Sequence, residues 1–143
     1  MTITKTGSAR YDGLGKSGKG QLSTGSGALS DQPYGFGTRF DGQVGTNPEE
    51  LIAAAHASCF TMALAFQLAD AGYENGTLET TAAVSLDKQD GGFAITRSAL
   101  KLTGRVPEAE RAKLEELAQK AKENCPVSKV LNAEITLETE WEG

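Results

Sequence analysis

The feature that most constrains the fold of this chain is one long apolar stretch, which we expect to form a single helix over residues 48–71. The residues TNPEE at positions 46–50 supply an N-cap candidate, a proline at the first helical position and two acids in the first turn. Each of these stabilises a helix N-terminus. Gly72 follows the last apolar residues and is expected to end the helix.

The apolar side chains of this helix fall around its whole circumference, with almost no charge between Leu51 and Ala69. A helix of this kind must be buried on nearly all sides. It would be about 36 Å long, which a single chain of 143 residues can hardly surround. Its many alanines would allow another helix to approach closely. The sequence therefore predicts a homodimer in which two central helices pack together.

The segments around the helix carry strand patterns. Short glycine-rich runs before position 46, such as residues 2–5 and 20–24, indicate strands and turns. Between them and the helix, the glycine-flanked aromatic segment at residues 33–40 is expected to be a loop or an edge strand that presents Arg39. Period-two alternation over residues 78–86 and 93–102, with a turn at 89–92, predicts a hairpin.

The C-terminal part mixes helix and strand. An amphipathic helix is expected to open at Pro107, and Pro126 should break it before a short helix through Leu131. Residues 133–141 alternate again and predict a final strand. The fold class is therefore α+β, and we expect one domain over residues 1–143.

Charge and composition exclude several partners. The net charge of −5 argues against nucleic acid, whose phosphates require clustered Lys and Arg. No basic amphipathic helix suits a membrane surface, and the N-terminus lacks the apolar segment of a signal peptide. We expect a cytoplasmic protein that acts on a small molecule or another protein.

The chain has two cysteines in contrasting settings. Cys59 lies in the middle of the long helix, where burial would raise its pKa and make it inert. Cys125 lies just before Pro126, where free backbone N–H groups at a helix start would lower a thiol pKa. The pair could be small core residues, a structural disulfide or a reactive thiol with its resolving partner, and a reducing cytoplasm disfavours the disulfide.

A reactive Cys59 would need a cation. His56, the only histidine, lies one turn away but is better explained as a packed or interface residue than as a base. Arg39 is the better candidate, because a guanidinium stays charged when desolvated, and Glu49 or Glu50 could orient it. Glu49 and Cys59 are ten residues apart on one helix, about 15 Å along its axis. The glutamate near each Cys59 should therefore come from the other subunit.

Four segments of the chain resemble the osmotically inducible protein C and organic hydroperoxide resistance family. Residues 47–60 (NPEELIAAAHASCF) and 124–131 (NCPVSKVL) carry the resemblance, while residues 33–40 (PYGFGTRF) and 84–88 (VSLDK) are closer to the osmotically inducible branch. The resemblance implies an intertwined homodimer with two β-sheets wrapped around two long central helices.

It also implies a thiol-dependent peroxidase. Cys59 would be the peroxidatic cysteine, Cys125 the resolving cysteine, and Arg39 with Glu49 the activating pair. The substrates would be organic hydroperoxides and, more weakly, hydrogen peroxide, and the reductant a dithiol such as dihydrolipoamide. The chemistry requires no metal and no organic cofactor. Such an enzyme would protect against oxidative and osmotic stress.

Two alternatives remain open at this point. A zinc site could use His56, Cys59 and Cys125, but it lacks an obvious fourth protein ligand. A non-catalytic stress-response or ligand-binding dimer would use both cysteines as structural residues. The natural peroxide, the reductant and the contributions of His56 and Glu50 are not fixed by the sequence.

Overall fold

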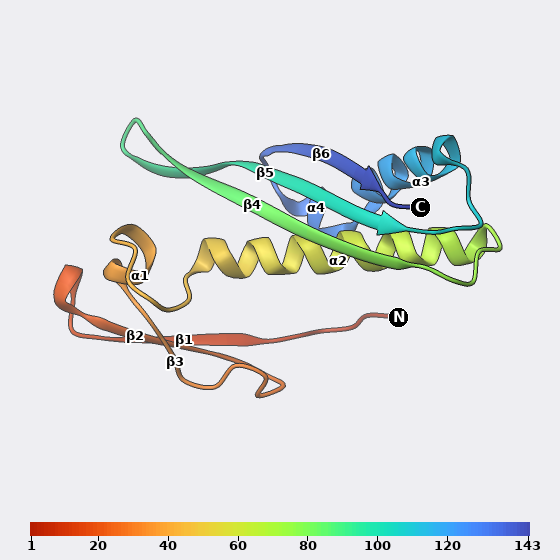
Figure 1. Cartoon of the computed structure of the whole chain (residues 1–143). Coiled ribbons are helices and arrows are strands. Elements are labelled where there is room, and N and C mark those ends of the chain that lie inside the picture. The colour runs from red at the N-terminus through yellow and green to blue at the C-terminus, as the bar shows by residue number, and fades with distance from the viewer. The chain divides into compact units, whose positions relative to one another are not determined.

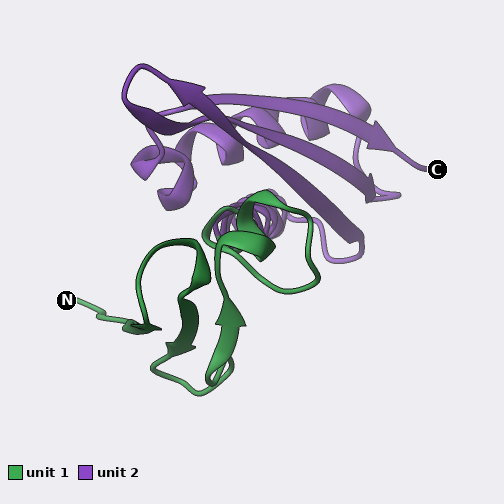
Figure 2. Ribbon diagram, turned by 90° about the vertical axis from the view of Figure 1, so that its left-hand side faces the viewer, with its two compact units in different colours: residues 1–51 green, residues 52–143 purple.

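The computed structural model describes residues 1–143, which form two compact units, residues 1–51 and residues 52–143 (Figure 2). Besides one turn of 3-10 helix at Gly15–Ser17, the elements labelled in Figure 1 are, in order, β1 (Gly7–Asp12), β2 (Lys19–Thr24), β3 (Gln32–Tyr34), α1 (Phe36–Phe40), α2 (Pro48–Asp70), β4 (Thr77–Gln89), β5 (Gly92–Arg105), α3 (Arg111–Asn124), α4 (Pro126–Val130) and β6 (Glu134–Trp141).

The first unit contains an antiparallel sheet in the order β1-β2-β3, followed by α1. The strand expected at residues 20–24 is confirmed, whereas residues 2–5 lie outside any strand and pairing begins at Gly7. Arg39 lies in the short helix α1 and not in a loop or edge strand. The hydroxyl of Thr38 accepts a hydrogen bond from the Gly35 N–H at 3.0 Å, which stabilises a helical turn that the surrounding glycines do not predict.

Helix α2 begins and ends where its local signals predict. Asn47 is the N-cap, because its Oδ1 accepts a hydrogen bond from the Glu50 N–H at 2.8 Å. The helix ends at Asp70, and Gly72 has φ +97°, a conformation that glycine adopts without strain. By length and composition α2 could cross a membrane, a property that it shares with the central helices of many soluble proteins.

One stripe of α2 is buried within the chain. It consists of every fourth residue, namely His56, Phe60, Leu64 and Leu68, as expected for one face of a helix. Other faces remain open, and the side chains of Met62 and Phe66 are 62% and 67% exposed. A single chain therefore leaves much of this apolar helix uncovered.

The second unit is built on a sheet in the order β4-β5-β6. The predicted hairpin is confirmed, with β4 and β5 paired antiparallel from Thr77 opposite Arg105 to Gln89 opposite Gly92. The predicted last strand, β6, pairs parallel to β5. The residues of β5 that face the helices, such as Leu100 and Leu102, form one core with apolar residues of α2 and α3.

The two C-terminal helices place the second cysteine. α3 begins at Arg111 and not at Pro107, because the chain turns and bends over residues 107–109 and Glu110 has an extended backbone. The helix ends before Cys125, which is extended as expected for a residue preceding proline. Pro126 then occupies the first turn of α4, as predicted.

Candidate active site

The structure brings the two cysteines together. Cys59 lies in the middle of α2, and Cys125 caps the N-terminus of α4. Both thiols are free, and they lie close enough for Cys125 to affect the pKa of Cys59. Cys125 is fully buried, whereas Cys59 is only partly covered. Two thiols in contact can close a disulfide without a large movement of the backbone.

The surroundings of Cys59 within this unit favour its protonated form. Burial raises the pKa of the Cys59 thiol, and the hydrogen bond with Cys125 raises it further. The backbone N–H of Val127, in the first turn of α4, hydrogen-bonds to the Cys59 sulfur. This contact lowers the pKa of Cys59 and so offsets part of the increase. No cation within this unit contributes to the pKa of Cys59.

Arg39 and Glu49 form a bidentate ion pair in the first unit. The Arg39 Nε donates to Glu49 Oε1 and the Nη2 to Oε2, both at 2.9 Å, the geometry of the strongest guanidinium–carboxylate pairs. The Glu49 side chain is 11% exposed and that of Arg39 37% exposed. The hydrogen bond to Glu49 raises the pKa of Arg39, so the guanidinium stays charged.

The same segment decides between the two candidate acids. Asn47 Nδ2 donates to the Thr38 carbonyl at 3.0 Å and so ties α1 to the start of α2, which brings Arg39 to Glu49. Glu50 is exposed and forms no ion pair. Glu49 and Cys59 stand on one uninterrupted helix, ten residues and about 15 Å apart along its axis. Arg39 and Glu49 therefore belong to the first unit, and Cys59 and Cys125 to the second.

His56 belongs to a buried polar cluster that the sequence did not reveal. Its Nδ1 lies 2.6 Å from Ser98 Oγ on β5, and its Nε2 lies 2.8 Å from Ser128 Oγ on α4. Burial lowers the pKa of His56. Because serine hydroxyls occupy both ring nitrogens, His56 offers no free nitrogen to Cys59 as a base or to a zinc ion as a ligand. One signal in the sequence could have indicated this cluster. Ser98 is a polar residue on the same face of the strand as the inward-facing Leu100 and Leu102.

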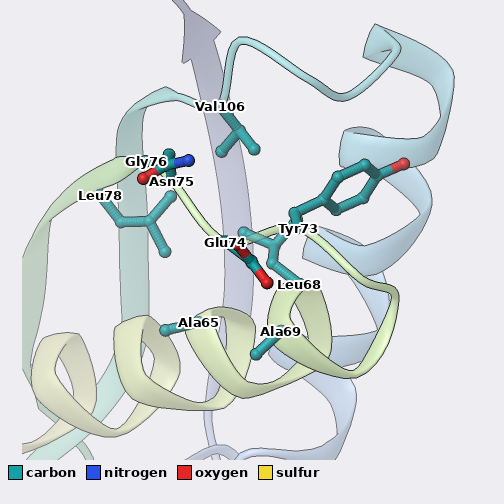
Figure 3. Close-up of a pocket in the computed structure, with 9 residues that line it drawn as sticks. All are labelled: Ala65, Leu68, Ala69, Tyr73, Glu74, Asn75, Gly76, Leu78 and Val106. Carbon is teal, nitrogen blue, oxygen red and sulfur yellow. The ribbon is translucent and has the colours of Figure 1, made fainter.

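A cavity of about 170 Å³ opens where α2 ends and β4 begins. Figure 3 shows that its walls are mostly apolar, with Leu68, Leu78 and Val106 around it and the side chains of Tyr73 and Glu74 nearby. Neither cysteine and no basic side chain lines it. It therefore lacks the groups that thiol chemistry requires, and the thiol pair is the better candidate for the reactive centre.

The fold is α+β. One unit carries two free cysteine thiols close together, and the other carries an arginine–glutamate ion pair, which is the residue set of a thiol-dependent enzyme. Residues 40–140 match the family described as OsmC-like protein, and the chain belongs to this family. The predicted family resemblance is thus confirmed.

Individual relatives agree with this assignment. The chain is 57% identical to the protein named Peroxiredoxin OsmC of Escherichia coli K12, over 96% of each chain. The crystal structure of the organic hydroperoxide resistance protein OhrB of Bacillus subtilis is 31% identical, with a TM-score of 0.68 over 96% of this chain and 98% of that one. An organic hydroperoxide resistance protein from Elizabethkingia anophelis, crystallised with thiocyanate, is 26% identical with a TM-score of 0.75 over 99% and 100%. The α+β fold is confirmed, and the identities favour the osmotically inducible branch.

Proposed function

We propose that this protein is a thiol-dependent peroxidase that reduces organic hydroperoxides to alcohols, and hydrogen peroxide more weakly. The observation that carries the proposal is the contact between the free thiols of Cys59 and Cys125. The names of the relatives, a peroxiredoxin and two organic hydroperoxide resistance proteins, support the same substrate class.

The reaction is written in two steps. The Cys59 thiolate attacks one peroxide oxygen, the O–O bond breaks, and Cys59 becomes a sulfenic acid while the departing alkoxide takes up a proton and leaves as an alcohol. The Cys125 thiol then attacks the Cys59 sulfur, which forms the disulfide and releases water. The close approach of the two thiols supports this second step, because it needs no rearrangement of α2.

We assign the activating role to Arg39 and Glu49. Burial raises the pKa of Cys59, so a nearby guanidinium is needed to stabilise the thiolate and the charge that develops on the departing oxygen. Glu49 holds Arg39 in a fixed orientation through two hydrogen bonds. About 15 Å of helix separates Glu49 from Cys59 of the same chain, which favours a site shared between two subunits.

A homodimer supplies such a site. The exposed Met62 and Phe66 on α2 offer an apolar face that a second copy of α2 would bury. Two antiparallel helices would bring the N-terminal end of one, with its ion pair, toward the middle of the other. Residues 1–143 would then act as one domain, with the two compact units joined in the intertwined dimer.

Subunit mixing tests the shared site. Glu49→Ala chains, which should be impaired, and Cys59→Ser chains, which should be inactive, are refolded together so that heterodimers form, and peroxide consumption is compared with that of each variant alone. A heterodimer would contain one intact site if the site is shared. A mixture of Glu49→Ala and Arg39→Ala chains is the matched control. Each chain then carries a broken Arg39–Glu49 pair, so neither site of the heterodimer is intact.

The reductant we propose is a dithiol such as dihydrolipoamide or a lipoylated protein. Cys125 is fully buried and Cys59 is the more accessible sulfur, so an incoming thiol would attack Cys59. The second thiol of the dithiol can then attack the reductant's own sulfur in the mixed disulfide, which breaks the bond to Cys59, releases Cys59 as a thiol and leaves the reductant as a cyclic disulfide. We propose that the protein is cytoplasmic, because a reducing compartment keeps such thiols free between turnovers.

Thiol titration tests the function. One equivalent of cumene hydroperoxide should remove both thiols of the wild-type protein and leave one intramolecular disulfide. Cys59→Ser should consume no peroxide, whereas Cys125→Ser should complete a first turnover and leave a sulfenic acid that dimedone traps. An unchanged thiol count in the wild-type protein would instead support the alternative of a non-catalytic dimer with structural cysteines.

A further inference from the structure

His56 links the elements that carry the two cysteines. It lies on α2, one turn before Cys59, and its Nε2 is 2.8 Å from the hydroxyl of Ser128 on α4, one turn after Cys125. Its Nδ1 is 2.6 Å from Ser98 on β5. The imidazole and the Ser98 side chain are fully buried, and Ser128 is 9% exposed.

We propose that His56 is a positioning residue that holds α4 through Ser128, so that the Cys125 thiol stays within reach of Cys59 for disulfide closure. This inference rests on the peroxidase function proposed above. It gives His56 no direct part in the attack on peroxide, which depends on Cys59 itself.

Imidazole suits this role because of its two opposed ring nitrogens. A neutral imidazole has one N–H donor and one acceptor nitrogen, and each serine hydroxyl can donate or accept to match. Burial lowers the pKa of His56 and keeps the ring neutral. No buried polar side-chain atom in the chain lacks a hydrogen-bond partner, so the cluster is fully satisfied in either tautomer of the ring.

α4 depends on tertiary contacts for its position. It has five residues, and helices much shorter than about 12 residues are unstable on their own in water. Val130 at its end is 76% exposed, while Val127 packs against the core. The hydrogen bond between His56 and Ser128 joins α4 to α2, in addition to the contact of the Val127 N–H with the Cys59 sulfur.

The position of Cys125 decides between two fates of the Cys59 sulfenic acid. In one, the Cys125 thiol attacks the sulfur, and a disulfide and water form. In the other, a second hydroperoxide transfers an oxygen, so that the sulfenic acid becomes a sulfinic acid and the peroxide becomes an alcohol. A displaced Cys125 slows the first path only. Loss of the His56–Ser128 contact should therefore raise the sulfinic share.

Ser128→Ala and Ser98→Ala form a matched pair for the test. Each removes one buried hydrogen bond to the same imidazole, but only the hydrogen bond of Ser128 links the imidazole to α4. The full-length dithiol protein is treated with excess cumene hydroperoxide, and intact mass spectrometry measures the ratio of disulfide to sulfinic acid. The rate of Cys59 thiol loss under one equivalent of peroxide reports the attack step separately.

We expect Ser128→Ala to raise the ratio of sulfinic acid to disulfide about three- to tenfold, the range that corresponds to one lost hydrogen bond. Ser98→Ala should change this ratio less than about twofold, and Ser128→Thr, which keeps the hydroxyl, should restore it. The rate of Cys59 thiol loss should stay near the wild-type rate in all three variants.

Equal changes in Ser98→Ala and Ser128→Ala, or no change in either, would overturn the positioning role while leaving the peroxidase function intact. Wild-type protein that forms neither disulfide nor sulfinic acid with peroxide would instead remove the proposed function, and this inference with it. Because the comparison is between two serine variants with His56 in place, it does not depend on whether a His56 variant folds.

Discussion

Replacing Glu49 by glutamine should lower kcat/KM for cumene hydroperoxide about tenfold. The carboxylate accepts two hydrogen bonds of 2.9 Å from Arg39, and glutamine can accept only one of them. Its amide N–H₂ would face the second guanidinium donor, and the negative charge would be lost. A hydrogen bond to a charged group contributes about 1.5–3 kcal/mol.

Water compensates part of this loss, because the Arg39 side chain is 37% exposed. We therefore take the lower end of the range, about 1.5 kcal/mol, which corresponds to a factor of about ten in the population of correctly oriented Arg39. Glutamine has nearly the shape of glutamate, so α2 should keep its N-terminal turn. The rate loss should thus reflect the orientation of Arg39 and not unfolding.

The assay measures initial rates of peroxide consumption with a dihydrolipoamide reductant. Glu50→Gln is the matched control, since Glu50 is the adjacent residue, is exposed and forms no ion pair; its activity should stay within about twofold of wild type. Circular dichroism on both variants checks the fold. Wild-type activity in Glu49→Gln, or an equal loss in Glu50→Gln, would refute the argument that Glu49 orients Arg39.

Three further results are expected. Arg39→Met should move the midpoint pH of iodoacetamide alkylation of Cys59 upward, because burial raises the thiol pKa and the variant lacks the cation that would lower it; an unchanged midpoint would mean that Arg39 does not act on Cys59. Phe66→Lys, at a site 67% exposed in the single chain, should weaken the dimer and make activity depend on protein concentration, which sedimentation would detect; a dimer of unchanged affinity would count against this face. Leu64→Ala removes a fully buried side chain and should lower the free energy of unfolding by about 2–5 kcal/mol in urea denaturation, whereas a loss well below 1 kcal/mol would contradict its place in the core.

Several elements follow from local signals. The start of α2 depends on Asn47, Pro48 and the two acids after it, and its end on Gly72, all within a few residues of the boundaries. The β4–β5 hairpin follows from its alternation and its glycine turn. Local patterns did not predict α1, a glycine-flanked segment whose turn is closed by the Thr38 hydroxyl together with backbone hydrogen bonds from Arg39 and Asp41.

The sequence by itself therefore determined the long apolar helix, the alternating strands and the two cysteines with their family resemblance. Only the tertiary structure decided that Glu49 and not Glu50 pairs with Arg39, that β6 lies parallel to β5, and that His56 joins Ser98 to Ser128. The physical reason is the distance in sequence over which each kind of interaction acts. Periodicity and capping act between neighbours in the chain, whereas hydrogen bonds between residues 42 and 72 positions apart exist only once the core has brought their elements together.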